Sequence, residues 1–376
     1  MTENLNFQKL QAEDEIEKVI FESNSCFAMD DNDRETMQFD FINNAFEYHY
    51  NNCDKYRKYC DTVNVNPKDI QTPKDYIKVP LIHSTLFKLT EVISGNKDDI
   101  VKVCQSSGTK GTVSKVFRDV PTVKRFFASI LVGLKQILKI TDAFCINLGP
   151  SPEEAGDLWI AYAIGLLHQI YETENMVVNG EYHLEKVVDL INSQKDKHNE
   201  IIIVGAPVMV LALIDYINKN NIVINGCEKL HFVTAGGWKR YTGQSISKLE
   251  FIDRIQKTFS GVLSENINDV YNMVELNSVF AECENHHKHV VPWTKVLIIN
   301  PEDMTLMREG EVGLIAYLDP SAKSYPCFVI TDDLGKITNE NSCECGRKGQ
   351  ILEIVRRVRS VDSRGCALKI DKKYVG

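Results

Sequence analysis

Residues 200–207 read EIIIVGAP, a short apolar run that ends at a glycine and a proline. A run of this length, rich in β-branched residues and bounded by turn formers, is typical of a strand buried on both faces. FCINLG at 144–149 and KLHFVTAGG at 229–237 share the pattern. Between and around these runs, apolar residues at helical spacing predict helices at 121–139, 153–171, 182–193, 208–221 and 246–259. Alternating strands and helices predict an α/β fold with a parallel or mixed sheet and helices on both faces.

The chain on either side of this region has a different sequence pattern. Residues 8–60 have helical spacing, whereas 61–100 contain Asn-Pro, Thr-Pro and Val-Pro turn signals. After about residue 290 the chain becomes β-rich, with KVLIIN, EVGLIAYL, PCFVITDD and ILEIVRRV, which indicates a smaller sheet appended to the α/β body. We therefore divide the chain into an N-terminal helical part (1–100), an α/β core (101–290) and a β-rich subdomain (291–376).

Composition excludes several classes of protein. The 376 residues are 43% hydrophobic and 25% charged, as in an ordinary globular protein. A formal net charge of −9 argues against a nucleic-acid partner. No apolar stretch approaches the ~20 residues of a membrane span, and the polar, acidic start is unlike a secretory signal. Eleven scattered cysteines without a signal are expected to be reduced thiols, so we expect a cytoplasmic protein.

A candidate phosphate-binding loop follows the apolar segment IVKVC. It consists of Ser106, Ser107, Gly108, Thr109, Lys110 and Gly111. Glycines let backbone N–H groups approach an anion, hydroxyls donate hydrogen bonds, and the lysine adds a positive charge. The spacing is not that of a Walker loop, and an ordinary surface turn uses the same residues. Lys115 and Arg118, just downstream, are candidate secondary phosphate contacts.

The loop and the SKVFRD that follows resemble the adenylate-forming superfamily, and most closely the acyl-protein synthetases of bacterial luminescence (the LuxE type), then the phenylacetate–CoA ligases. The likeness continues in order through AFEYHYNNCDKYRKYC, VPLIHSTLFKLTE, INLGPSP, VTAGGWK, VELNSVFAE, HVVPW, YPCFVITDDLG, EIVRRVRS and RGCAL, which cover nearly the whole chain. It implies a ligase that uses ATP and Mg²⁺ to convert a long-chain fatty acid to acyl-AMP and then passes the acyl group to a thiol. It also implies a fatty-acid reductase complex, in which a thioesterase-type subunit supplies the acid and a reductase-type subunit takes the acyl group to the aldehyde.

The resemblance gives roles to further residues of the nucleotide site. Ala235, Gly236 and Gly237 end a predicted strand where the adenine would lie, although a plain turn needs the same glycines. Tyr271 and Glu275 match a motif in which the tyrosine contacts the nucleotide and the glutamate holds Mg²⁺. Asn272 and Val274 depart from that motif, since they replace a glycine and a hydroxyl residue.

Asp333 matches the aspartate that binds the ribose hydroxyls, and Asp332 replaces the usual glycine before it. Arg356 or Arg357 matches the phosphate-neutralising arginine that follows, and we take Arg357. The resemblance also implies a C-terminal lid domain with a catalytic lysine. Only a few residues follow Arg364-Gly365, so we expect that lid to be largely absent.

Cys366 is the expected acyl acceptor. An acyl-AMP is a good electrophile, and a thiolate that attacks it forms a thioester. Arginines at 356, 357, 359 and 364 favour the thiolate form. A lone cysteine is more often a small buried hydrophobe, but the LuxE type carries its acylated cysteine in a matching Gly-Cys context.

A metal site is a separate expectation. Cys283, His289, Cys343 and Cys345 would make a set of three thiolates and one imidazole, which suits structural Zn²⁺. His286 or His287 could replace His289, and two unrelated surface features are the alternative. Some phenylacetate-ligase-like proteins show a similar pair of segments, which supports zinc.

Two rival functions stay open. One is an acyl–CoA or acyl–carrier-protein ligase, in which the acceptor thiol is external. The other is a non-catalytic scaffold subunit that docks a reductase, which the altered motif around Tyr271 and the missing lysine allow. The apolar segment FFASILVGLKQIL, which begins at Phe126, could line an acyl tunnel or simply pack in the core.

Overall fold

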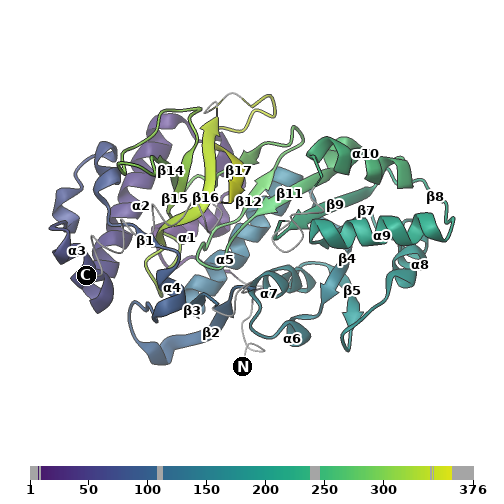
Figure 1. Ribbon diagram of the computed structural model, residues 1–376, viewed down its shortest axis with the longest axis horizontal. Coiled ribbons are helices and arrows are strands. Elements are labelled where there is room, and N and C mark those ends of the chain that lie inside the picture. Colours follow the sequence, from purple (N-terminus) through teal and green to yellow (C-terminus); the bar gives the residue numbers. More distant parts are fainter. Residues whose placement is uncertain are drawn as a thin grey trace.

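The computed structural model describes residues 7, 10–107, 113–237, 246–338, 341 and 343–357. Thirteen strands of these residues form one sheet that runs through the molecule (Figure 1). Its parallel part runs through β5 (Glu172–Val178), β4 (Ala143–Pro150), β7 (Glu200–Gly205), β9 (Leu230–Ala235) and β11 (Ile267–Tyr271), each hydrogen-bonded to the next. The three apolar runs were therefore correctly predicted to be neighbouring buried strands.

Helices cover both faces of this parallel part. Ile201 and Ile203 of β7 pack in one cluster with α8 (Leu184–Gln194), α9 (Pro207–Lys219) and α10 (Lys248–Thr258). Ile202 and Val204 point to the opposite face, where they pack against Leu134 and Leu167. Leu134 belongs to a π-helix, η6 (Gly133–Leu138), that continues α5 (Val120–Val132). The alternation along β7 confirms the prediction of a layered α/β fold.

The sheet continues beyond β11 as an antiparallel region. Its strands, in order from β11, are β12 (Phe280–Glu282), β13 (Lys288–His289), β17 (Ile351–Arg357), β16 (Phe328–Thr338), β15 (Gly313–Leu318) and β14 (Lys295–Ile299). The β-rich region predicted after residue 290 as a smaller, appended sheet is continuous with the main sheet, because backbone pairing of β13 with β17 joins these strands to it. Strands from 1–100, 101–290 and 291–376 share one sheet, and the division at 100 and 290 stays a prediction.

The N-terminal part is largely helical, as predicted. Its longest elements are α2 (Asp31–Asn52) and α3 (Asp54–Thr62), which Figure 1 shows beside the antiparallel end of the sheet, with α8, α9 and α10 beside the parallel end. The remaining elements are α1 (Glu15–Glu17), η1 (Lys18–Glu22), η2 (Cys26–Ala28), η3 (Pro67–Asp69), η4 (Pro73–Lys78), β1 (Ile82–His83), α4 (Leu86–Leu89), η5 (Lys97–Asp99), β2 (Ile100–Gln105), β3 (Lys115–Asp119), α6 (Pro152–Ala155), α7 (Trp159–Gly165), η7 (Leu166–Gln169), β6 (Glu181–Tyr182), β8 (Ile224–Asn225), β10 (Phe259–Ser260) and η9 (Ser264–Asn266).

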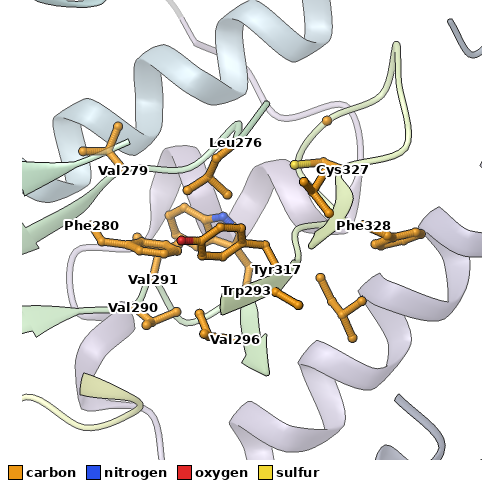
Figure 2. Packing of buried hydrophobic residues seen from close by; sticks show 14 of the residues in the cluster. Leu276, Val279, Phe280, Val290, Val291, Trp293, Val296, Tyr317, Cys327 and Phe328 are labelled. Carbon is orange, nitrogen blue, oxygen red and sulfur yellow. The ribbon is translucent and has the colours of Figure 1, made fainter. Parts of the chain in front are cut away.

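The largest hydrophobic cluster fills the space between the antiparallel region and the N-terminal helices. Trp293, Tyr317 and Phe328 are fully buried at its centre (Figure 2). The indole N–H of Trp293 donates to Oγ of Ser278 at 2.9 Å, so the largest side chain of the core keeps its polar atom satisfied. Among the helices of the described residues, none has the length and apolar character that crossing a bilayer requires.

Candidate active site

Two motifs that lie far apart in sequence meet at the carboxyl end of β11. Tyr271 is the last residue of that strand, and its hydroxyl donates a 2.9 Å hydrogen bond to Oδ2 of Asp333 on β16. Burial, with the Asp333 carboxylate second, raises the pKa of Tyr271 well above its usual value, so this phenol stays protonated and remains a donor. The structure thus brings together the predicted nucleotide-contacting tyrosine and the predicted ribose-binding aspartate.

The glycine pair predicted to lie against adenine is beside them. Ala235 is in register with Val270, one residue before Tyr271. Gly236 and Gly237 follow with φ values of +87° and +59°, which L side chains rarely adopt. A Cβ on Gly236 would lie 3.3 Å from Cγ1 of Ile160 on α7, whereas a Cβ on Gly237 would meet no atom of the described residues within 4 Å. The backbone is therefore packed at Gly236 and open at Gly237.

The candidate phosphate loop connects the two strands of an antiparallel hairpin, β2 and β3. Ser106 and Ser114 close its base, where the Ser106 N–H donates to the Ser114 carbonyl and the Ser114 N–H donates to Oγ of Ser106. Ser107 follows at the start of the loop. The predicted phosphate ligands Gly108, Thr109, Lys110 and Gly111 lie outside the described residues.

Arg118 of β3 is not a secondary phosphate contact, and that interpretation was wrong. Its side chain is fully buried. The guanidinium donates to the Val274 carbonyl at 2.7 Å and to Oδ1 of Asn277 at 3.3 Å. Both acceptors belong to the segment that begins at Tyr271. Arg118 therefore joins the phosphate-loop hairpin to that segment, just as Tyr271 joins the segment to Asp333. Lys115, the other residue proposed as a phosphate contact, is exposed at the start of β3.

Glu275, the predicted Mg²⁺ ligand, is 5% exposed and lies between the two acceptors of Arg118. Its carbonyl accepts a 3.0 Å hydrogen bond from the Cys327 thiol. Val274, which replaces the hydroxyl residue of the family motif, is buried in the main cluster. Asn272 replaces the motif's glycine and donates to the carbonyls of Leu276 and Ser278, which fixes the turn after β11.

His83 is a neighbour of this site that sequence reasoning missed. It lies on β1, which pairs with β16 beside Ile330. The Thr85 N–H donates to Nδ1 of His83, so Nε2 carries the proton that faces Oδ1 of Asp332 at 3.3 Å. The only signal in the sequence was that His83 falls within VPLIHSTLFKLTE, one of the segments that carried the family resemblance.

The C-terminal candidates are placed only in part. Arg357 is directly opposite Asp333 in the pairing of β16 with β17, and Arg356 is opposite Leu334. The role predicted for Arg357 stays a prediction. Cys366 lies outside the described residues.

An apolar cavity of about 80 Å³ adjoins the nucleotide motifs. Its lining comes from α5 and η6, from α7, and from β7, β9, β11 and β12. Phe126, Ile130 and Leu134 form the stripe of the predicted tunnel segment that faces it. Ala235 and Asn272 also line it, so the cavity reaches the glycine turn and the Tyr271 segment. Asn272 carries the one polar side chain among the described lining residues.

The four predicted metal ligands converge in a second place. One ligand atom from each of Cys283, His289, Cys343 and Cys345 lies within 4.8 Å of all the others. Sγ of Cys283 is 3.6 Å from Sγ of Cys343, and Nε2 of His289 is 3.3 Å from Sγ of Cys345. Metal–ligand bonds of about 2.0–2.3 Å in a tetrahedron separate the ligand atoms by roughly 3.3–3.8 Å, so these distances fit.

The alternative histidines are less well placed. Nδ1 of His287 lies 3.2 Å from Sγ of Cys343, whereas Nε2 of His286 faces the Ser264 hydroxyl. Burial opposes ionisation of Cys345, but hydrogen bonds from Arg347 outweigh it and lower the pKa of that thiol. Nδ1 of the buried His289 has no hydrogen-bond partner in the ranges that the structure describes. The set that the sequence predicted is thus the set that the fold brings together.

Comparison with known proteins places this geometry in a family. The family model described as "Acyl-protein synthetase, LuxE" matches residues 1–375. A long-chain-fatty-acid–luciferin-component ligase of Vibrio harveyi is 32% identical over 335 residues, which are 89% of this chain and 87% of that protein. A ligase of the same name from Aliivibrio fischeri is 33% identical over 334 residues, 88% of this chain and 86% of that protein.

Solved structures agree on the fold. An open conformation of 2-hydroxyisobutyryl-CoA ligase, in complex with its acyl-AMP and CoA, superposes with a TM-score of 0.69 at 15% identity. The match covers 94% of this chain and 80% of that one. At this identity the likeness shows the adenylate-forming fold alone. The chain is therefore an acid–thiol ligase with the adenylate-forming fold, and it belongs to the LuxE family of acyl-protein synthetases.

Proposed function

We propose that this ligase activates a long-chain fatty acid with ATP and Mg²⁺ and transfers the acyl group to its own Cys366. The observation that carries the proposal is the 2.9 Å hydrogen bond between Tyr271 and Asp333, next to an apolar cavity that is lined by Val270 and Asn272, the two chain neighbours of Tyr271. A ribose needs a fixed carboxylate that accepts hydrogen bonds from its hydroxyls. A fatty acid needs an apolar space that ends beside the nucleotide.

The residues present fit a nucleotide. The Asp333 carboxylate, which the Tyr271 hydroxyl holds at Oδ2, would accept hydrogen bonds from the ribose hydroxyls. The open backbone at Gly237 gives an adenine ring a surface free of side chains. Ser106 and Ser107 begin a loop whose backbone N–H groups would meet the phosphates, with Gly108, Thr109, Lys110 and Gly111 completing it. Glu275 would hold Mg²⁺, which supplies positive charge against the phosphates.

The cavity supports a long alkyl chain as the substrate. Small-molecule pockets are lined predominantly by hydrophobic side chains, and this cavity is lined almost entirely by hydrocarbon. Each methylene that leaves water for such a lining contributes about 0.8 kcal/mol. The relatives' own name refers to long-chain fatty acids.

The proposed reaction has two steps. A carboxylate oxygen attacks the α-phosphorus of ATP, and pyrophosphate leaves with the electrons of the broken P–O bond. The thiolate of Cys366 then attacks the acyl carbon of the mixed anhydride, and AMP leaves. Arg357, opposite Asp333 on the paired strand, would neutralise phosphate charge during both steps.

We also propose the setting of the enzyme. The ten cysteines that the structure describes are free thiols, which supports a cytoplasmic location. A thioester on Cys366 is an intermediate that a reductase-type subunit could take to the aldehyde, with a thioesterase-type subunit as the source of acid. That assignment rests on the family.

Covalent labelling tests the acceptor. Wild-type protein, Cys366→Ser and the control Cys227→Ser, which replaces a buried cysteine, are incubated with ATP, Mg²⁺ and labelled palmitic acid. We expect label on the wild type and the control, none on Cys366→Ser, and acid-dependent pyrophosphate exchange in all three. Normal labelling of Cys366→Ser, or label that collects on added coenzyme A instead, would favour a ligase with an external acceptor.

We further propose that Cys283, His289, Cys343 and Cys345 hold a structural Zn²⁺. All but Cys345 are buried, and the set contains no open position for substrate. The ligands come from β12–β13 and from the segment between β16 and β17. Arg347 in that segment donates to the Gln136 and Ile137 carbonyls of η6. A metal here would therefore fix β17 and the helix that lines the cavity.

Metal analysis tests the zinc proposal. We expect about one equivalent of zinc in protein purified without chelator, and loss of it in Cys283→Ser and Cys345→Ser. Cys26→Ser is the control, because Cys26 is buried near Gln136 but outside the set. A wild-type protein that contains no zinc, and whose melting temperature does not rise when zinc is added, would contradict the proposal.

A further inference from the structure

Arg118 is a buried cation that forms no ion pair with any carboxylate in the described part of the chain. It is 0% exposed. Its Nε and Nη2 atoms donate to Asn277 Oδ1, the Val274 carbonyl and, at 3.3 Å, the Tyr325 hydroxyl, while Nη1 finds no hydrogen-bond acceptor among the residues that the structure describes. Its guanidinium lies 3.8 Å from the ring centroid of Trp159, within the range of a cation–π contact. A guanidinium stays charged, so the fold retains an expensive group at this position.

The contacts of Arg118 are concentrated on one segment. Val274 and Asn277 flank Glu275, and the hydrogen bond to the Val274 carbonyl, at 2.7 Å, is the shortest of the three that Arg118 makes. The carbonyl of Val274 belongs to the peptide bond that links it to Glu275. Arg118 therefore fixes the orientation of the peptide unit from which the Glu275 side chain departs.

Trp159 holds the same segment from its other end. One face of the indole meets the Arg118 guanidinium, and the indole N–H donates to Oδ1 of Asn272. Asn272 in turn donates to the carbonyls of Leu276 and Ser278. The turn between Tyr271 and Ser278 is thus held by one cation and one indole, and the cation belongs to the strand that follows the phosphate loop.

We propose that Arg118 is a positioning residue that, by holding the Val274–Glu275 peptide against β3, orients the Glu275 carboxylate to bind the Mg²⁺ that accompanies ATP. The proposal rests on the function proposed above. In this role Arg118 does not touch the nucleotide. It acts through the Val274–Glu275 peptide, and its loss should weaken the metal-dependent part of ATP binding alone.

A double-mutant cycle on binding provides the test. ATP affinity is measured by calorimetry with Mg²⁺ and with EDTA, for the wild type, Arg118→Lys, Glu275→Gln and the double variant. Lysine keeps the charge but cannot reach two acceptors and stack at once. We expect Arg118→Lys to reduce the Mg²⁺-dependent gain in affinity about tenfold and to leave the affinity in EDTA unchanged. In the Glu275→Gln background the same substitution should have no further effect.

Two further variants separate this role from packing. Arg125→Met removes another buried arginine, which is ion-paired with Glu17 and Asp14, and should lower the melting temperature without changing the Mg²⁺ effect. Trp159→Phe keeps a ring for the guanidinium but removes the N–H donated to Asn272. It should reproduce the Arg118→Lys result even if the lysine variant fails to fold.

The outcomes are distinct. Two results would overturn the positioning role while leaving the ligase proposal intact. In one, the losses of ATP affinity in Arg118→Lys and Glu275→Gln add fully in the double variant. In the other, Arg118→Lys lowers the ATP affinity equally with Mg²⁺ and with EDTA. A wild type that binds no ATP under either condition would overturn the proposed function, and this inference with it.

Discussion

The hydroxyl of Tyr271 donates a 2.9 Å hydrogen bond to Oδ2 of Asp333 across a gap of 62 residues in sequence. The bond joins the carboxyl end of a parallel strand to an antiparallel strand of the same sheet. Ligands of open α/β sheets bind beyond the carboxyl ends of strands. The contact therefore marks where nucleotide motifs from two halves of the sheet meet.

Tyr271→Phe should raise the KM for ATP about tenfold or more. The substitution removes one donor from the Asp333 carboxylate, and a hydrogen bond to a charged group contributes about 1.5–3 kcal/mol. Measurement of pyrophosphate exchange against ATP concentration gives the KM. Tyr76→Phe is the control, since the buried Tyr76 hydroxyl makes no hydrogen bond within the described part of the chain and its loss should leave KM unchanged. Equal KM values for Tyr271→Phe and wild type would remove Tyr271 from the site.

Ala163→Phe should shift the acid preference toward shorter chains. Ala163 lines the cavity from α7, and a phenyl ring there takes space from the alkyl chain. Loss of room for two methylenes corresponds to about 1.6 kcal/mol, so the activity ratio of palmitic to octanoic acid should fall about tenfold. Ala155→Phe, on α6 outside the cavity lining, should leave the ratio unchanged. A normal ratio in Ala163→Phe would mean that the alkyl chain binds elsewhere.

His49→Gln should make stability less dependent on pH in the acid range. Burial lowers the pKa of His49 from 6.5 to about 3, and its ring accepts from Ser94 and donates to the Ala322 carbonyl. Below pH 6.5 the unfolded chain binds a proton that the folded chain does not, so the unfolding free energy falls as pH falls toward 3. The slope from one such histidine is at most about 1.4 kcal/mol per pH unit.

Denaturant unfolding of both proteins across this range measures the slope. Glutamine can keep one hydrogen bond at position 49 but does not titrate. The unfolding free energy of the wild type should therefore change more steeply with pH than that of His49→Gln, by at most the slope that binding of one proton causes. Parallel stability profiles would show that His49 becomes protonated without unfolding the chain.

Much of the fold was predictable from sequence because its strands are buried on both faces. A strand such as β7 is apolar at every position from Ile201 to Val204, and the intervening helices have clear apolar spacing. The join between the parallel and antiparallel regions was not predictable. It depends on the two-residue strand β13 pairing with β17, a contact between segments about 60 residues apart for which the sequence carries no local signal.

Site residues that belong to family motifs were predictable from the sequence. Site residues whose role depends on tertiary contacts were not. Tyr271, Asp333 and the four Cys/His residues were named from sequence and are brought together by the fold. Arg118 was misread because a cation after a glycine-rich loop usually faces an anion. Its actual partners, which include Trp159 and Val274, are neighbours only in the folded chain.

Carboxylate-dependent exchange of labelled pyrophosphate into ATP tests the central claim most directly, with wild type and Asp333→Asn compared in the presence of Mg²⁺ and palmitic acid. We predict exchange by the wild type that depends on the acid, and a loss of about tenfold or more in kcat/KM for ATP in Asp333→Asn. Exchange that is absent from the wild type with every acid, or that is equal in the two proteins, would contradict adenylation at the pocket formed by Tyr271 and Asp333.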